Sequence, residues 1–136
     1  MSRILVIDDD DLVRRTVETM LRMAGHNVEL AVDGADGLRQ FQQHAFDLVI
    51  ADIFMPNKEG LETIRELRQI TQETPIITMT GSFPGPHRSG DLGNVDYLRM
   101  AQVFGATRTL SKPFSHRELL ALVDECLRGG TSGSQE

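Results

Sequence analysis

The sequence predicts an α/β domain in which a central parallel sheet of five strands is covered by helices on both faces. Short β-branched apolar runs alternate with segments whose apolar residues repeat at helical spacing through most of the 136 residues. Strands that alternate with helices in this way favour parallel pairing through right-handed crossovers. The expected architecture is a three-layer sandwich with the strand order 2-1-3-4-5.

The first strand and helix are predicted at residues 3–7 and around residues 13–24. Residues 3–7 read Arg-Ile-Leu-Val-Ile, which is typical of a strand buried on both faces, and four aspartates follow directly. Acidic residues suit the first turn of a helix, so we expect Asp10 and Asp11 to cap it, with Gly25 at its C-terminus. This leaves Asp8 and Asp9 without a structural role.

The same alternation continues through the middle of the chain. Further strands are predicted at residues 28–32, 48–51 and 75–79. A helix opened by Asp33 and Gly34 follows the second strand, and a helix at residues 60–70 follows the third. Asp52 stands where the third strand ends, and Thr80 closes the fourth.

The C-terminal third is predicted to begin with a long irregular loop. Periodicity disappears over residues 81–95, and a helix is expected at residues 96–104. A short strand at residues 108–110 leads to Lys112 and Pro113, and Ser115 is expected to cap the last helix. Residues 1–128 then form the domain, which is flavodoxin-like with a (βα)5 layout, and residues 129–136 form a flexible tail.

Composition excludes several classes of protein. The chain has 40% hydrophobic and 25% charged residues, which is typical of a soluble folded domain. Its net charge of −6, without a basic patch, argues against direct nucleic-acid binding. No apolar run resembles a membrane span or a signal peptide, and the single cysteine, Cys126, cannot form an internal disulfide and is expected in the core. A cytoplasmic location is the expectation.

Clustered acids at the carboxyl ends of the strands point to phosphate chemistry. Asp8, Asp9 and Asp52 would meet at one sheet edge, where each pair repels by about 4 kcal/mol at 4 Å in an effective dielectric of about 20. A hard divalent cation such as Mg²⁺ would offset this repulsion. Asp52 could then act as a nucleophile toward a phosphoryl group, while Lys112 supplies a positive charge and Thr80 a hydroxyl. Each residue alone is unremarkable, and only their joint placement predicts a site.

Over residues 3–127 the chain resembles the receiver domain of two-component response regulators, a CheY-like superfamily. The resemblance rests on Ile-Leu-Val-Ile-Asp-Asp-Asp from residue 4, Asp33-Gly34, Asp-Leu-Val-Ile-Ala-Asp-Ile-Phe-Met-Pro from residue 47, Pro-Ile-Ile-Thr-Met-Thr-Gly from residue 75, and Lys-Pro-Phe from residue 112. It implies a phosphorelay signalling domain that is not a conventional enzyme, phosphorylated by a sensor histidine kinase or histidine phosphotransfer protein and read by an unknown output protein or domain.

The resemblance also assigns roles to single residues. It implies Asp52 as the phosphoacceptor, Thr80 and Lys112 as the residues that contact the phosphoryl group, and a cis peptide bond before Pro113. The implied Mg²⁺ ligands are Asp8, Asp9, Asp52 and the backbone carbonyl of Phe54.

Two departures from the family pattern concern signal output. Thr109 stands where the family often has an aromatic residue on the last strand, and the segment at residues 81–95 is longer than usual. We therefore expect Phe83 and Tyr97, rather than an aromatic on the last strand, to shift on activation. A purely structural insertion is the alternative.

Two other functions stay open at this stage. A haloacid-dehalogenase-like phosphatase would use two aspartates separated by one residue, with Asp8 as its nucleophile. A pseudo-receiver would only bind proteins. The sequence also leaves open whether the chain is a stand-alone regulator or part of a longer one, and which kinase it serves.

Overall fold

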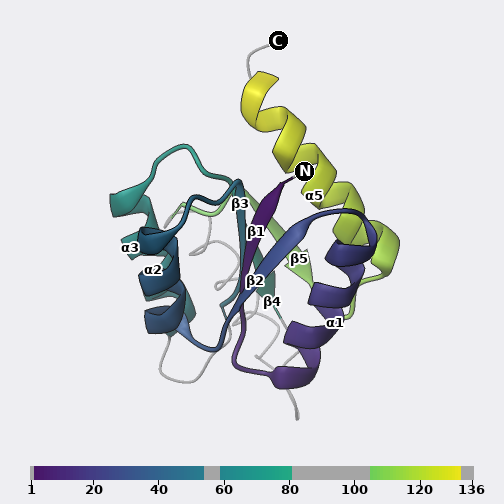
Figure 1. Cartoon of the computed structure of the whole chain (residues 1–136), viewed down its shortest axis with the longest axis horizontal. Helices are drawn as coiled ribbons and strands as arrows, with labels where there is room; N and C mark the ends of the chain where they lie inside the picture. The colour runs from purple at the N-terminus through teal and green to yellow at the C-terminus, as the bar shows by residue number, and fades with distance from the viewer. Residues whose placement is uncertain (1, 54–58, 81–104, 133–136) are drawn as a thin grey trace, which may run out of the picture.

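The computed structural model describes residues 2–53, 59–80 and 105–132, and these form the predicted α/β sandwich (Figure 1). All the strand pairs are parallel, and the sheet order is β2-β1-β3-β4-β5, which confirms the prediction. The strands are β1 (Arg3–Ile7), β2 (Asn27–Ala31), β3 (Leu48–Asp52), β4 (Ile76–Thr80) and β5 (Arg108–Ser111). The helices are α1 (Asp11–Met23), α2 (Gly34–Gln43), α3 (Glu59–Ile70) and α5 (His116–Ser132).

The loop expected at residues 81–95 and the helix expected at residues 96–104 lie outside the described residues. The same holds for Phe83 and Tyr97, so the hypothesis about signal output stays a prediction.

Helices cover the two faces of the sheet in pairs. Figure 1 shows α1 and α5 on one side of the strands and α2 and α3 on the other. Along β1, Ile4 and Val6 join the core that contains residues of α1 and α5, while Leu5 and Ile7 join the core that faces α3. Because side chains alternate along a strand, the all-apolar run of β1 supplies both cores at once. None of the described helices has the length and apolar character that crossing a bilayer requires.

Capping side chains fix where the helices begin. Asp10 accepts hydrogen bonds from the backbone N–H groups of Leu12 and Val13 at 2.9 and 3.2 Å, which confirms its predicted role as the cap of α1. Ser115 and Glu118 bond each other's backbone N–H at 3.0 and 2.8 Å, so α5 begins with a capping box. These contacts satisfy helix N–H groups that have no partner within the helix.

Several element boundaries differ from the sequence prediction by one or two residues. Strand β2 runs from Asn27 to Ala31 instead of residues 28–32, because it pairs with the five residues of β1 and Ile7 faces Ala31 as the last pair. Val32 lies beyond this pair and is 51% exposed. Helix α5 extends to Ser132 and so includes residues 129–132.

The parallel arrangement brings the strand ends to one edge of the sheet. Asp52 is the last residue of β3 and Thr80 the last of β4, with Asp52 opposite Met79 and Thr80 opposite Ser111. Asp8 and Lys112 directly follow β1 and β5. The residues singled out in the sequence therefore stand at the same edge.

Helix α3 starts directly against this edge because Gly60 has no side chain. A Cβ atom at Gly60 would lie 2.3 Å from Cα of Ile53 and 2.6 Å from the backbone oxygen of Asp52. Both neighbours are backbone atoms, which cannot rotate away as a flexible side chain can. Glycine is therefore required for the start of α3 to pack on the end of β3.

We predict that Gly60→Ala destabilises the fold by about 2 kcal/mol, although alanine is the better helix former by up to about 1 kcal/mol. The overlap with the backbone of Asp52 and Ile53 outweighs the gain in helix propensity. Urea unfolding monitored by circular dichroism measures the change. Glu66→Ala, at an exposed position of the same helix, is the control and should change stability by less than about 0.5 kcal/mol. Unchanged stability in Gly60→Ala would contradict the close packing.

Candidate functional site

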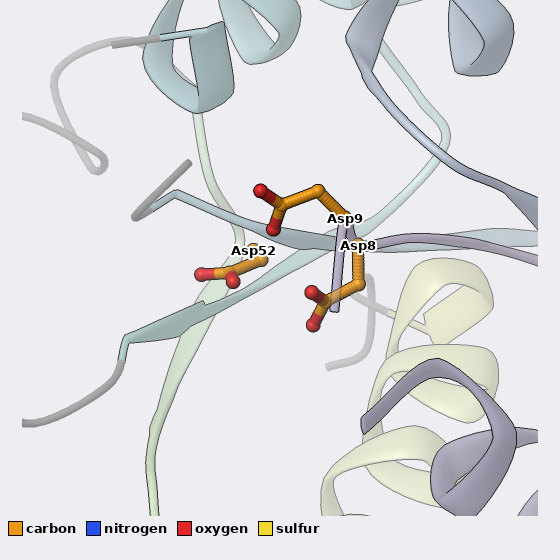
Figure 2. Close-up of side chains that lie close together, drawn as sticks. All are labelled: Asp8, Asp9 and Asp52. Atoms are coloured by element: carbon orange, nitrogen blue, oxygen red, sulfur yellow. The ribbon is translucent and has the colours of Figure 1, made fainter. Parts of the chain in front are cut away.

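Three carboxylates converge above neighbouring strands, as Figure 2 shows. Asp8 and Asp9 follow β1, and Asp52 ends the adjacent β3. One carboxylate oxygen from each lies within 4.8 Å of the others. Asp8 is fully buried and Asp52 is 4% exposed, whereas Asp9 faces solvent. The sequence predicted this cluster, and the structure confirms that the three side chains meet.

Lys112 brings a positive charge to the two buried acids. Its Nζ atom lies 3.5 Å from Oδ2 of Asp8 and 3.3 Å from Oδ2 of Asp52. The backbone N–H of Lys112 donates to the carbonyl of Thr80 at 2.7 Å, which fixes the start of the lysine beside β4. The peptide bond between Lys112 and Pro113 is cis, as the resemblance implied.

Three acids face one ammonium group here, so the described site carries more negative than positive charge. Burial raises the pKa of Asp8 from 3.8 to about 6, and the charge of Asp52 adds to this increase. The backbone N–H of Asp10, which donates to Oδ1 of Asp8 at 2.8 Å, and the ammonium of Lys112 act in the opposite direction. The carboxyl group of Asp8 is therefore destabilised in its charged form until a cation joins the cluster.

The donor set fits a hard divalent cation. All three side chains offer carboxylate oxygens, and the cluster is the only one in the described ranges with three or more potential acidic, histidine or cysteine ligands. Mg²⁺ prefers oxygen ligands and binds through a few carboxylates while it keeps several waters. Asp8, Asp9 and Asp52 could hold it. The backbone carbonyl of Phe54, expected as a further ligand, lies outside the described residues.

Two threonines singled out in the sequence lie on β4 and β5. Thr80 is 1% exposed at the end of β4, next to the end of β3. Thr109, in place of an aromatic residue, lies opposite Thr78 on β4 and is half-buried. Cys126 is buried in the core between the sheet and α5, as expected.

Sequence reasoning missed Arg14, which contacts the acidic site from α1. Its Nη1 atom donates to the backbone carbonyl of Asp8 at 2.7 Å, and its side chain is only 12% exposed. One signal could have found it: long helical side chains lean toward the helix N-terminus, and Arg14 lies one turn after the capping residue Asp10.

Comparison with known proteins identifies response regulators, both by family model and by individual relatives. A family model described as the response regulator receiver domain matches residues 4–124. The transcriptional regulatory protein CpxR of Klebsiella pneumoniae subsp. pneumoniae (strain HS11286) is 38% identical over 128 residues, which cover 94% of this chain and 50% of that protein. Response regulator MprA of Mycobacterium sp. (strain KMS) is 37% identical over 128 residues, covering 93% of this chain and 50% of that protein.

The fold also matches solved structures. The crystal structure of a CheY-like response regulator receiver domain protein from Methanospirillum hungatei JF-1 has a TM-score of 0.84 at 24% identity, over 98% of this chain and 99% of that chain. At this identity the likeness shows the shared fold. This chain spans about half the length of the curated relatives CpxR and MprA.

We predict that the affinity for Mg²⁺ rises with pH up to about 6 and then levels off. The proton on Asp8, with its pKa raised to about 6, competes with the cation, so affinity should fall about tenfold per pH unit below that value. Isothermal titration calorimetry between pH 5 and pH 8 measures this. Asp8→Asn removes the competing proton and should bind Mg²⁺ weakly with little dependence on pH near 6. A wild-type affinity that does not change across this range would contradict the prediction.

Proposed function

Because the chain belongs to the response regulator receiver domain family, whose general function is phosphorylation on an aspartate, we propose that it accepts a phosphoryl group on Asp52 in a Mg²⁺-dependent reaction. The observation that carries the proposal is the position of Asp52 at the end of β3. Its carboxylate lies close to those of Asp8 and Asp9, which follow β1, and to the ammonium of Lys112. Asp8 and Asp9 lie beyond β1, where they serve as metal ligands in this proposal.

The chemistry of the step follows from the carboxylate of Asp52. One of its oxygens forms a bond to phosphorus while the bond from phosphorus to the donor atom breaks, so an acyl phosphate replaces the unmodified carboxylate. With a phosphohistidine donor, the leaving group is the imidazole nitrogen of the partner, which takes up a proton. Bound Mg²⁺ supplies charge neutralisation between the acidic side chains and the phosphoryl oxygens.

Lys112 and Thr80 are proposed to act on the phosphoryl group from the neighbouring strands. The ammonium of Lys112 lies close enough to Asp52 to meet a phosphoryl oxygen attached there. Thr80 ends the strand beside β3 and offers a hydroxyl hydrogen to another such oxygen. The hydroxyl and the lysine would thus bind two different oxygens of the phosphoryl group.

The partners follow from the proposed role. We propose that the donor is a sensor histidine kinase or a histidine phosphotransfer protein, and that an output protein or domain reads the phosphorylated form. A net charge of −6 favours a protein partner over direct nucleic-acid contact by this chain. We propose that it promotes only its own phosphorylation and slow dephosphorylation.

The phosphatase hypothesis is wrong, since the family that matches is that of receiver domains. The structure gives a local reason as well. Such a phosphatase would need the carboxyl group of Asp10 for proton transfer, but that group accepts hydrogen bonds from the first turn of α1. A pseudo-receiver that only binds proteins would contain the same fold without accepting phosphate, and labelling separates the two.

We predict that Asp52→Asn abolishes phosphorylation, because an amide oxygen is a poor nucleophile toward phosphorus. Incubation with acetyl phosphate and Mg²⁺, followed by intact mass, measures the phosphate adduct. Asp47→Asn is a matched control, because Asp47 is exposed and directly precedes the opposite end of the same strand. Within the part of the chain that the structure describes, its side chain bonds only the backbone N–H of Arg3. An adduct that persists in Asp52→Asn would refute the assignment, and no adduct on the wild type would favour the pseudo-receiver.

We predict that Lys112→Ala slows phosphorylation by at least about tenfold while Mg²⁺ binding stays equal or becomes tighter. The lysine stabilises charge on the phosphoryl group, but its ammonium repels a cation bound to the same acids. Initial rates with acetyl phosphate and calorimetric Mg²⁺ titrations measure the two effects separately. Arg117→Ala removes an exposed charge of the same sign from α5 and should change neither. Loss of Mg²⁺ binding in Lys112→Ala would contradict this division of roles.

A further inference from the structure

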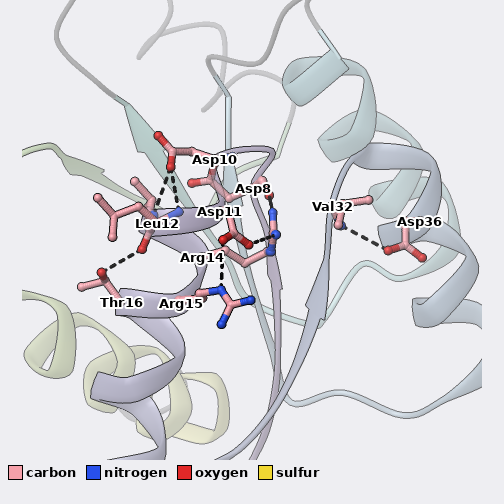
Figure 3. A network of polar contacts seen from close by, with 10 residues as sticks. Asp8, Asp10, Asp11, Leu12, Arg14, Arg15, Thr16, Val32 and Asp36 are labelled. Carbon is pink, nitrogen blue, oxygen red and sulfur yellow. Dashed lines mark hydrogen bonds and ion pairs between the residues drawn. The ribbon is translucent and has the colours of Figure 1, made fainter.

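Two adjacent arginines of α1 share one acidic partner, but only one of them reaches the acidic site. Arg14 and Arg15 both pair with Asp11, at 2.6 and 3.0 Å (Figure 3). Arg14 alone also donates from Nη1 to the backbone carbonyl of Asp8 at 2.7 Å. The exposed fraction of the side chain is 12% for Arg14 and 71% for Arg15. The chain thus contains a buried arginine and an exposed one with otherwise similar contacts.

The carbonyl that Arg14 binds lies just past the end of β1. The backbone N–H of Asp8 still donates to Ala31 of β2 at 3.2 Å, but β1 itself ends at Ile7. Without a strand partner on this side, a buried carbonyl needs another donor. Arg14 supplies that donor from the first turn of α1, and Asp11 holds the other arm of its guanidinium at 2.6 Å.

These contacts close a ring around the turn that bears the acidic pair. The backbone N–H of Asp10 donates to Oδ1 of Asp8 at 2.8 Å, and the backbone N–H of Arg14 donates to the carbonyl of Asp10 at 3.0 Å. The bond from the Arg14 side chain to the carbonyl of Asp8 completes the ring. A planar guanidinium can bridge two acceptors in fixed directions, which a single ammonium cannot do.

We propose that Arg14 is a positioning residue that holds the turn of Asp8 and Asp9 in the geometry needed to bind a divalent cation. Its guanidinium bonds the backbone carbonyl of Asp8 and the carboxylate of Asp11, so it acts through the backbone of Asp8. This role rests on the proposed function, since it concerns the same metal site. The effect opposes simple electrostatics, because a guanidinium near a cation site would by charge alone weaken cation binding.

The test compares Arg14→Ala with the matched control Arg15→Ala, which also loses a bond to Asp11 but leaves the carbonyl of Asp8 paired. Mg²⁺ titration by calorimetry should show roughly tenfold weaker binding for Arg14→Ala, the usual loss when a residue that supports a metal ligand is removed. Arg15→Ala should bind like the wild type. In metal-free protein, hydrogen exchange of the Asp10 amide should accelerate only in Arg14→Ala. The phosphorylation rate of Arg14→Ala should recover to within about twofold of wild type at saturating Mg²⁺.

The Mg²⁺ affinities of the arginine variants decide whether Arg14 is a positioning residue. Equal or tighter Mg²⁺ binding by folded Arg14→Ala, or an equal loss in Arg15→Ala, overturns the positioning role. If Arg14→Ala does not fold, Arg14→Lys keeps the stem and charge but loses the two-armed bridge, so it should bind Mg²⁺ at least about threefold more weakly; wild-type affinity would overturn the proposal. Failure of the wild type to bind Mg²⁺ or take up phosphate would instead refute the proposed function.

Discussion

The meeting of three carboxylates with one ammonium group at the carboxyl edge of the sheet is the constraint on which the rest of the site depends. Each close pair of charged acids costs about 4 kcal/mol at 4 Å in an effective dielectric of about 20, and Lys112 offsets only part of this. Burial of Asp8 increases the cost, as its raised pKa indicates. A site that is unfavourable when empty is suited to bind a cation and an incoming phosphoryl group, because both relieve the same imbalance.

The fold can sustain this cost because the strands that carry the acids are its best-packed part. Every residue of β3 is buried, and two apolar cores enclose the sheet from both faces. A single domain has only about 5–15 kcal/mol of net stability, so the cost of the acidic edge is large compared with the stability that remains after folding. The edge is also stiff: Gly60 lets α3 contact the backbone of Asp52, and Asp10 holds the carboxylate of Asp8 through its N–H.

The sequence was sufficient to predict the sheet order and the acidic cluster, since both follow from periodicity and from acids placed directly after strands. It was less informative about strand limits and side-chain exposure, which tertiary contacts determine. The limits of β2 follow from its register with β1, which no local pattern encodes, and Val32 is exposed although its residue type favours a strand. Met23 of α1 likewise is 74% exposed although its side chain is apolar. Arg14 was overlooked because a charged residue on a first helical turn resembles a solvent-exposed one until its side chain is seen.

Other arginines of the sheet-covering helices also bind backbone carbonyls, as Arg14 does. Among the described residues, three guanidinium groups join a helix to main-chain carbonyls at or near strand ends: Arg14 to Asp8, Arg22 to Val28, and Arg68 to Thr74 and Gly105. Burial lowers the pKa of Arg68, yet an arginine stays charged, so its donors are always available. Apolar packing joins helices to the middle of a strand, but a strand end leaves carbonyls unpaired. Guanidinium groups satisfy these carbonyls at both edges of the sheet: Arg14 acts at the carboxyl edge that carries the acidic site, and Arg22 and Arg68 act at the opposite edge, where β2, β4 and β5 begin.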